Sequence, residues 1–208
     1  MTNDHNGKEA LIQGMIGYGA LRSPRIIDAF RTIDRKYFVP DHFADEIYGD
    51  YPLPIGEQQT ISQPTTVAFM LELLGAKEGD RVLDIGSGSG WTTALLAHIV
   101  GERGEVIGLE RQKALVEKGR RNIELFHFGH VRIEQADDTL GMAGEQFDAI
   151  LVSASAPEIP EQLFAQLKPG GTLVIPVLNS IYRFTKLSET EIKQEEYPGF
   201  VFVPLIYK

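Results

Sequence analysis

The chain of 208 residues contains no cysteine. This absence excludes disulfide bonds, a thiolate nucleophile and any zinc site built on cysteine ligands. Basic residues are also scarce, since 20 Lys and Arg stand against 29 Asp and Glu and give a net charge of −9. We therefore expect no nucleic-acid partner and no binding to an anionic membrane through nonspecific charge.

Long apolar runs are missing as well. No run approaches the roughly eighteen residues needed to cross a bilayer, and the opening MTNDHNGKEA lacks the basic and then apolar pattern of a secretory signal. We expect a cytoplasmic protein without membrane contact. His127 and His130 lack a third candidate ligand nearby in the sequence, so no metal site is predicted.

The second half of the chain alternates between two kinds of pattern. Expected strands cover 81–86, 105–110, 131–137, 147–154 and 172–177, with helices at 91–101, 112–126 and, shorter, 160–167. This alternation predicts an α/β, Rossmann-like, doubly wound and mostly parallel sheet with helices on both faces. Two last alternating segments, 182–189 and 200–207, predict a C-terminal antiparallel hairpin at the sheet edge.

The first part of the chain reads differently. Residues 8–38 show helical spacing, and Ser23 followed by Pro24 is a good helix start. The stretch GDYPLPIGEQQTISQP at 49–64 has three prolines and two glycines, which exclude a continuous helix or a central strand. We expect one domain over 1–208, in which a helical extension with this loop (1–64) precedes a ligand-binding core (65–208).

A glycine-rich turn, VLDIGSGSGW, joins the first expected strand of the core to its helix. Its three glycines, Gly86, Gly88 and Gly90, let a ligand approach the backbone, and the helix start offers free N–H groups. Trp91 stands where a dinucleotide fingerprint needs its last glycine, and Trp91-Thr92 stands where a P-loop needs Lys and then Ser or Thr. What remains is G-x-G-x-G with an acidic residue, Asp84, two positions before it.

This turn resembles the S-adenosylmethionine loop of class I methyltransferases. Acidic residues also end the next two expected strands: Glu110 is placed to accept hydrogen bonds from ribose hydroxyls, and Asp137 is placed to reach the adenine amino group. The resemblance implies S-adenosyl-L-methionine as cofactor, with a core binding set of Asp84, Gly86, Ser87, Gly88, Gly90, Glu110, Arg111, Asp137 and Asp138.

Further motifs resemble the protein-L-isoaspartate O-methyltransferase family. They are KYFVP, PLPIGEQQTISQP, FDAILVSA, IPEQLFAQLKPGGTLVIPV and the C-terminal FVPLI, in the family's order. The resemblance runs from about Arg25 to Pro176 and implies that the 49–64 loop covers the cofactor and lines the substrate channel. It assigns cofactor contacts to Gln59, Thr60, Ile61 and Ser62, and catalysis to Ser62.

The implied reaction is methylation of the free α-carboxylate of an L-isoaspartyl residue, and the ester then forms a succinimide that reopens partly to aspartate. Isoaspartyl-containing proteins and peptides are the expected partners of a monomeric enzyme. A carboxylate with a pKa of about 4 is already ionised at pH 7 and needs no general base. Ser62 would hold this carboxylate; the alternative is that Ser62 caps the helix that follows Pro64.

Some positions depart from the family pattern. Gln58 stands where many members have glycine, and Val67 stands near a position where relatives often have histidine. Ala136 and Leu178 also differ from the residues usual in the family. Two alternatives therefore stay open: a methyltransferase of the same fold with another carboxylate acceptor, and a non-catalytic module that binds S-adenosylmethionine.

Overall fold

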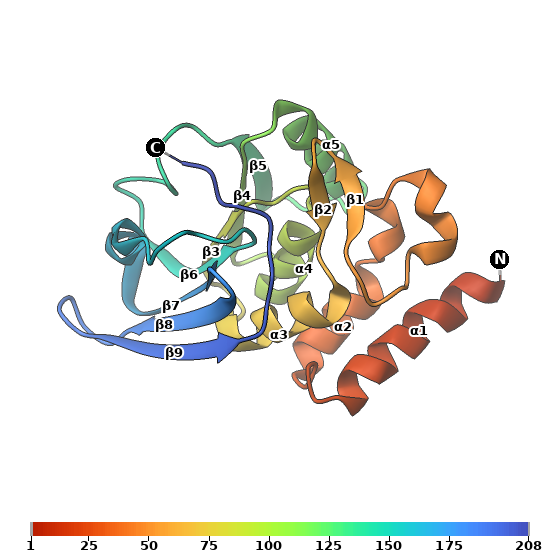
Figure 1. Cartoon of the computed structure of the whole chain (residues 1–208), viewed down its shortest axis with the longest axis horizontal. Coiled ribbons are helices and arrows are strands. Elements are labelled where there is room, and N and C mark those ends of the chain that lie inside the picture. Colours follow the sequence, from red (N-terminus) through yellow and green to blue (C-terminus); the bar gives the residue numbers. More distant parts are fainter. Residues whose placement is uncertain (1, 208) are drawn as a thin grey trace.

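The computed structural model describes residues 2–207, with side chains from residue 7 onward. A seven-stranded sheet with the order β5-β4-β3-β6-β7-β8-β9 forms its centre (Figure 1). The first five strands in this order pair in parallel, and β3 lies between β4 and β6. These strands are β3 (Arg81–Ile85), β4 (Glu105–Glu110), β5 (Val131–Gln135), β6 (Phe147–Val152) and β7 (Leu167–Val177). The mostly parallel sheet is confirmed.

The α-helices of the described chain pack on one face of this sheet. They are α1 (Thr2–Gly17), α2 (Pro24–Thr32), α3 (Pro64–Leu74), α4 (Trp91–Val100) and α5 (Lys113–Glu124). All five contribute to one buried cluster with strand residues such as Val82 and Val106, whereas Leu83 and Ile107 point into a second cluster on the opposite face. The second face is covered by the 3-10 helix η3 (Glu161–Gln166) and the loop that carries Leu140. The short helix expected at 160–167 is therefore present in 3-10 form.

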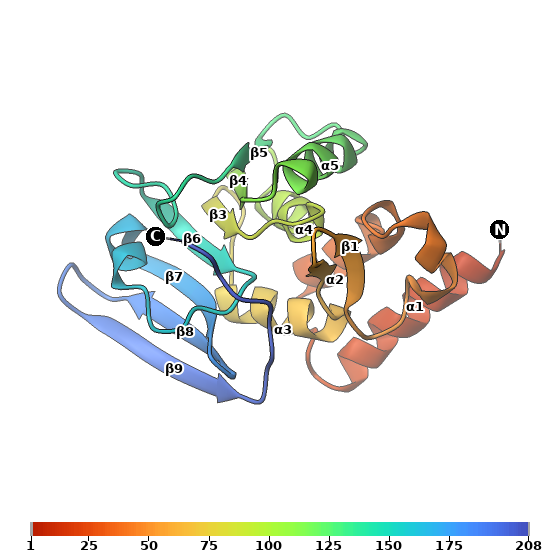
Figure 2. The same cartoon turned by 45° about the horizontal axis from the view of Figure 1, so that its top comes forward.

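The C-terminal hairpin is confirmed, but its second strand lies earlier than predicted. It consists of β8 (Ser180–Lys186) and β9 (Ile192–Pro198), both antiparallel to their neighbours. The run 200–207, predicted as the second strand, forms only an isolated bridge between Pro204 and Ser155. An edge strand tolerates charged side chains, so the polar β9 takes this place. The apolar run instead leaves the end of β9 and passes toward β6 (Figure 2).

The other helices and strands of the core begin and end close to the predicted residues. The strand expected at 172–177 begins earlier, at Leu167, so residues 168–171 (KPGG) lie inside β7, and the pairing of β7 with β6 shifts register between Phe147 and Ala149. Over residues 2–207, no helix combines the length and the apolar character that a membrane crossing requires.

The proline-rich stretch contains a small hairpin of its own, β1 (Leu53–Gly56) and β2 (Gln59–Ile61), which lies beside α4 and α5 (Figure 1). Two 3-10 helices, η1 (Arg35–Tyr37) and η2 (Asp41–Glu46), precede it. The tip of the hairpin has positive φ at Glu57 and Gln58, 52° and 58°. This pair of values is typical of a type I′ turn, whose twist matches that of the flanking strands. The hairpin is thereby held as a compact unit in front of the glycine turn.

Candidate active site

The glycine turn lies at the carboxyl ends of β3 and β4. Its three glycines have φ values of 81°, 55° and 89°, a region that residues with a Cβ rarely adopt. The N–H groups of Gly86 and Ser87 donate to the Leu109 carbonyl at 2.8 and 3.0 Å. A Cβ added to Gly88 would lie 3.2 Å from Cδ1 of Ile55 in β1. The proline-rich hairpin therefore packs directly against the turn, which agrees with the covering loop that the family resemblance implies.

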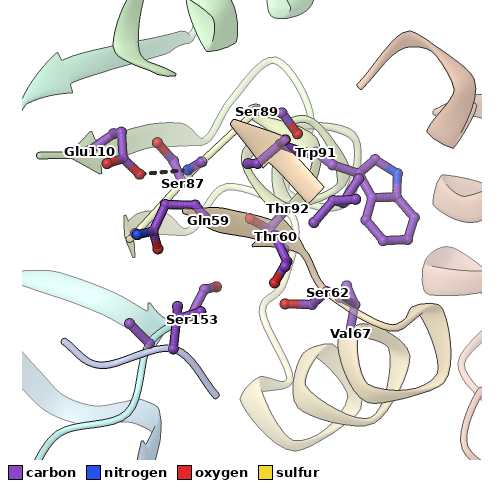
Figure 3. A pocket seen from close by; sticks show the side chains of 16 residues that line it. Gln59, Thr60, Ser62, Val67, Ser87, Ser89, Trp91, Thr92, Glu110 and Ser153 are labelled. Carbon is purple, nitrogen blue, oxygen red and sulfur yellow. Dashed lines mark hydrogen bonds between the residues drawn. The ribbon is translucent and has the colours of Figure 1, made fainter. Parts of the chain in front are cut away.

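A first cavity opens between the hairpin and the turn (Figure 3). Eight of the expected cofactor residues line it: Gln59, Thr60, Ile61, Ser62, Gly86, Ser87, Gly88 and Glu110. The hydroxyl of Ser87 is buried and, among the described residues, has no hydrogen-bond partner. A buried polar group without a partner costs free energy, so this hydroxyl fits a ligand that supplies the missing hydrogen bond.

A second cavity adjoins the first and shares Gln59, Gly86, Glu110 and Ala154 with it. Its walls combine apolar side chains with two further expected residues, Arg111 and Asp137. The Thr139 hydroxyl and N–H donate to one oxygen of Asp137, at 2.6 and 2.7 Å, and hold the pKa of Asp137 below its usual value. The apolar walls suit a flat ring, and the ionised carboxylate suits an amino group beside it.

Glu110 lies between the two cavities and is only 7% exposed. One carboxylate oxygen accepts from the Gly88 N–H at 3.0 Å, and the other accepts from the Gln112 N–H at 2.7 Å. Each carboxylate oxygen can accept a second hydrogen bond. Glu110 can therefore fix the turn and still accept hydrogen bonds from two neighbouring hydroxyls of a ligand.

Three expected cofactor residues line neither cavity: Asp84, Gly90 and Asp138. Asp84 is fully buried and accepts from the hydroxyls of Thr92 and Thr93 at 2.8 and 2.6 Å. Burial raises the pKa of Asp84 to about 6. In this structure Asp84 links the end of β3 to the first turn of α4 through these hydrogen bonds, so it stabilises the glycine turn that lies between them.

An open groove leads to the first cavity from outside. It is lined by Pro52, Thr60, Ser62, Gln63, Thr66, Ser153 and the C-terminal residues 199–203. It shares four residues with the first cavity, namely Thr60, Ser62, Ser153 and Val203. We call the place where they meet the junction. A molecule in the groove and a molecule in the first cavity would both contact these four residues.

Ser62 does not cap helix α3. Gln63 occupies the N-cap position without a side-chain cap hydrogen bond. The carboxylate of Asp50 accepts instead, from the Thr65 N–H at 2.9 Å and from its hydroxyl at 2.7 Å. The cap interpretation of Ser62 is therefore wrong, and within the described chain the Ser62 hydroxyl has no hydrogen-bond partner.

Two residues at the site escaped the sequence analysis. Ser153 follows β6 and lies in the motif FDAILVSA, which was expected to be a strand and resembles the family but was not expected to line the site. Arg35 is a buried arginine, 3% exposed, in the short helix η1. The Arg35 guanidinium donates to backbone carbonyls of the proline-rich stretch, and it lies 5.4 Å from the ring centre of Trp91. Trp91 itself is buried and lines the first cavity. A buried arginine has no periodic signature in sequence, so no pattern could identify it.

Comparisons with known proteins agree with this geometry. The sequence model described as protein-L-isoaspartate(D-aspartate) O-methyltransferase matches residues 5–208. A protein-L-isoaspartate O-methyltransferase from Trichlorobacter lovleyi is 42% identical over 211 residues, which cover 99% of this chain and 96% of the relative. One from Methanothrix thermoacetophila is 42% identical over 203 residues, which cover 97% and 95%.

A solved structure is similar over the same extent. The crystal structure of a Plasmodium falciparum protein described as a putative protein-L-isoaspartate O-methyltransferase, in complex with S-adenosyl-L-homocysteine, superposes with a TM-score of 0.84 at 28% identity. The match covers 97% of this chain and 99% of that chain. With the glycine turn, the covering hairpin and the matched length taken together, the chain belongs to the protein-L-isoaspartate O-methyltransferase family.

Proposed function

We propose that this protein transfers the methyl group of S-adenosyl-L-methionine to the free α-carboxylate of L-isoaspartyl residues in damaged proteins and peptides, and so starts their repair through a succinimide. The observation that carries the proposal is the junction, where Ser62 of the family motif TISQP lines both the first cavity and the open groove. We also propose that the enzyme acts as a monomer in the cytoplasm.

The residues present suit the cofactor. The backbone of Gly86 and Gly88, the unpartnered Ser87 hydroxyl and the carboxylate of Glu110 would hold the sulfur-bearing and ribose parts in the first cavity. Asp137 would hold the adenine amino group in the second. When bound, S-adenosyl-L-methionine supplies an electrophilic methyl group on a positively charged sulfur.

The protein's own contribution is to position the acceptor and to keep water away. The acceptor carboxylate arrives ionised, so no proton has to be removed from it. The Ser62 hydroxyl would donate to one of its oxygens, and a hydrogen bond to a charged acceptor contributes about 1.5–3 kcal/mol. Ile55, Ile61 and Val67 give the first cavity an apolar wall, which would exclude water from the nucleophile. Orientation of the reacting groups can then supply much of the rate enhancement.

A transfer assay tests the proposal. The protein is incubated with methyl-labelled S-adenosyl-L-methionine and a peptide that carries one isoaspartyl residue, beside its normal aspartyl twin. We expect label only in the isoaspartyl peptide, and about tenfold or greater loss of kcat/KM in Ser62→Ala. Equal labelling of both peptides would contradict the isoaspartyl assignment. Cofactor binding without transfer to any carboxylate acceptor would instead indicate a non-catalytic module.

A further inference from the structure

Hydroxyl groups approach the junction from two sides. Thr60 and Ser62 come from β2 and the residue just beyond it, and Ser153 follows β6 on the opposite wall (Figure 3). In Figure 3 the side chains of Ser62 and Ser153 point toward each other across the cavity. Ser153 is one of the four residues that line both the first cavity and the open groove. A group bound between cofactor and groove would therefore meet Ser153 as well as Ser62.

The sheet holds Ser153 in place. Its N–H donates to the carbonyl of Ile85 at 2.8 Å, which continues the contact between β6 and β3. A Cβ added to Gly86 would lie 3.8 Å from Cβ of Ser153, so the serine sits beside the glycine turn. Two residues later, the backbone of Ser155 is bonded to Val203 and Leu205 of the C-terminal run, both at 2.8 Å. Ser153 is thus anchored on a rigid edge, whereas Ser62 lies on the hairpin side.

The junction offers neutral rather than cationic hydrogen-bond donors to a bound carboxylate. Among the described residues, no Lys, Arg or His lines either the open groove or the first cavity. Of the described residues that line the first cavity, only Glu110 is charged, and it is an acid. A carboxylate that loses its water must receive hydrogen bonds in return, and it has two oxygens to satisfy. Thr60 and Ser62 offer hydroxyls from the hairpin side, and Ser153 offers one from the opposite wall.

We propose that Ser153 is a second substrate-contacting hydroxyl, which donates to the acceptor carboxylate from the wall opposite Ser62. This inference rests on the proposed function and adds a residue to it. Two donors on opposite walls fix the plane of the carboxylate and so decide which oxygen faces the methyl donor. Neutral hydroxyls bind the anion more weakly than an arginine fork would, and they leave more electron density on the attacking oxygen.

Binding experiments separate this role from a merely structural one. Calorimetry is done in the presence of saturating S-adenosyl-L-homocysteine, with two peptides that differ only in the isoaspartyl α-group, carboxylate or carboxamide. For the parent protein we expect the carboxylate peptide to bind more tightly. In Ser153→Ala its affinity should fall about tenfold or more, while the carboxamide peptide changes by no more than about twofold. Ser153→Thr keeps the hydroxyl and should restore most of the preference.

Ser155→Ala is the matched control, because its hydroxyl donates to the Leu178 carbonyl at 3.0 Å and lines neither the cavity nor the groove. It should leave the ratio of the two peptide affinities unchanged. An equal loss of affinity for both peptides in Ser153→Ala, or no loss for either peptide, would overturn the role of Ser153. The proposed function would still stand if the parent protein methylates the isoaspartyl peptide. A parent protein that never methylates the isoaspartyl peptide would overturn the proposed function itself.

Discussion

The guanidinium of Arg35 donates a hydrogen bond to the backbone carbonyl of Ser62 at 3.2 Å. The same group donates to the carbonyls of Ile47, Gly49 and Tyr51 at 2.6 to 3.1 Å. Burial lowers the pKa of Arg35 to about 10, so the side chain keeps its charge at pH 7. A single buried cation therefore fixes both ends of the segment that carries the proposed catalytic serine.

Arg35→Lys should loosen this segment. Lysine keeps the charge but lacks the planar guanidinium that reaches several carbonyls at once. Some of the four carbonyls would therefore lose their hydrogen bond to a charged donor. We expect a loss of about 2–4 kcal/mol in the free energy of unfolding, measured in urea, from the weakened charged hydrogen bonds. Faster amide exchange should appear in residues 47–62. Arg31→Lys, which changes an exposed arginine paired with Glu9, is the control. Unchanged exchange in Arg35→Lys would contradict the positioning role.

Asp50→Ala should weaken the start of helix α3. Its carboxylate accepts the Thr65 N–H, 15 residues away in sequence, and takes the place of a local cap. Caps and an acid at a helix N-terminus each contribute about 1 kcal/mol, so unfolding in urea should show a loss of about 1–2 kcal/mol. Ser62→Ala should lose almost none. Equal losses in both variants would restore Ser62 as a helix cap.

Asp84 makes the stability of the folded protein decrease as pH rises, which is opposite to the usual effect of an aspartate. The folded protein holds a proton on Asp84 up to a pKa of about 6, whereas an ordinary aspartate loses it at 3.8. Between these values the folded state binds the proton and the unfolded chain does not, so this residue's contribution to stability falls as pH rises through the window. The full difference corresponds to about 3 kcal/mol.

Asp84→Asn removes this dependence. Its free energy of unfolding, relative to the parent protein, should rise by about 2 kcal/mol between pH 4 and pH 7 in urea titrations. Asp45→Asn, at an exposed carboxylate, should show a much smaller change. A relative stability of Asp84→Asn that stays constant over this range would contradict the buried proton.

The hairpin tip carries strain that substitution can relieve. Glu57 and Gln58 both have positive φ, which costs about 1–2 kcal/mol for residues with a Cβ. Type I′ turns favour Asn followed by Gly, so Glu57→Asn combined with Gln58→Gly should raise the free energy of unfolding by about 1 kcal/mol. Thermal unfolding of the double variant checks this. A lower midpoint temperature would contradict the assigned turn.

Glu110→Ala should weaken the binding of S-adenosyl-L-homocysteine by about 1–3 kcal/mol, because the proposed bonds to the ribose hydroxyls are lost. Glu110→Gln keeps an acceptor oxygen and should lose less. Calorimetry gives both affinities, and circular dichroism checks the fold, since Glu110 also holds the N–H groups of Gly88 and Gln112. Unchanged affinity in Glu110→Ala would remove this residue from the site.

Local sequence patterns predicted the structure correctly where a residue's role depends on its neighbours in sequence. The strands of the core, the glycine turn and the acids Glu110 and Asp137 follow from periodicity and from strand ends, and the structure places these acids beside the two cavities. The second strand of the hairpin was misplaced because β9 has charged side chains, such as Lys193 and Glu195, that an edge strand tolerates. The apolar run after it resembled a strand more closely.

The sequence by itself determined the fold class and the ligand-binding turn, because short-range spacing of apolar residues, glycines and acids specifies parallel strands and the loops at their ends. The family was indicated by the resemblance of its motifs. Only the tertiary structure decided which side chains meet at the junction. Arg35 and Ser62 are 27 residues apart, and Ser62 and Ser153 come from opposite walls of one cavity. Such contacts depend on how the hairpin packs against the sheet, and that packing has no period in the sequence.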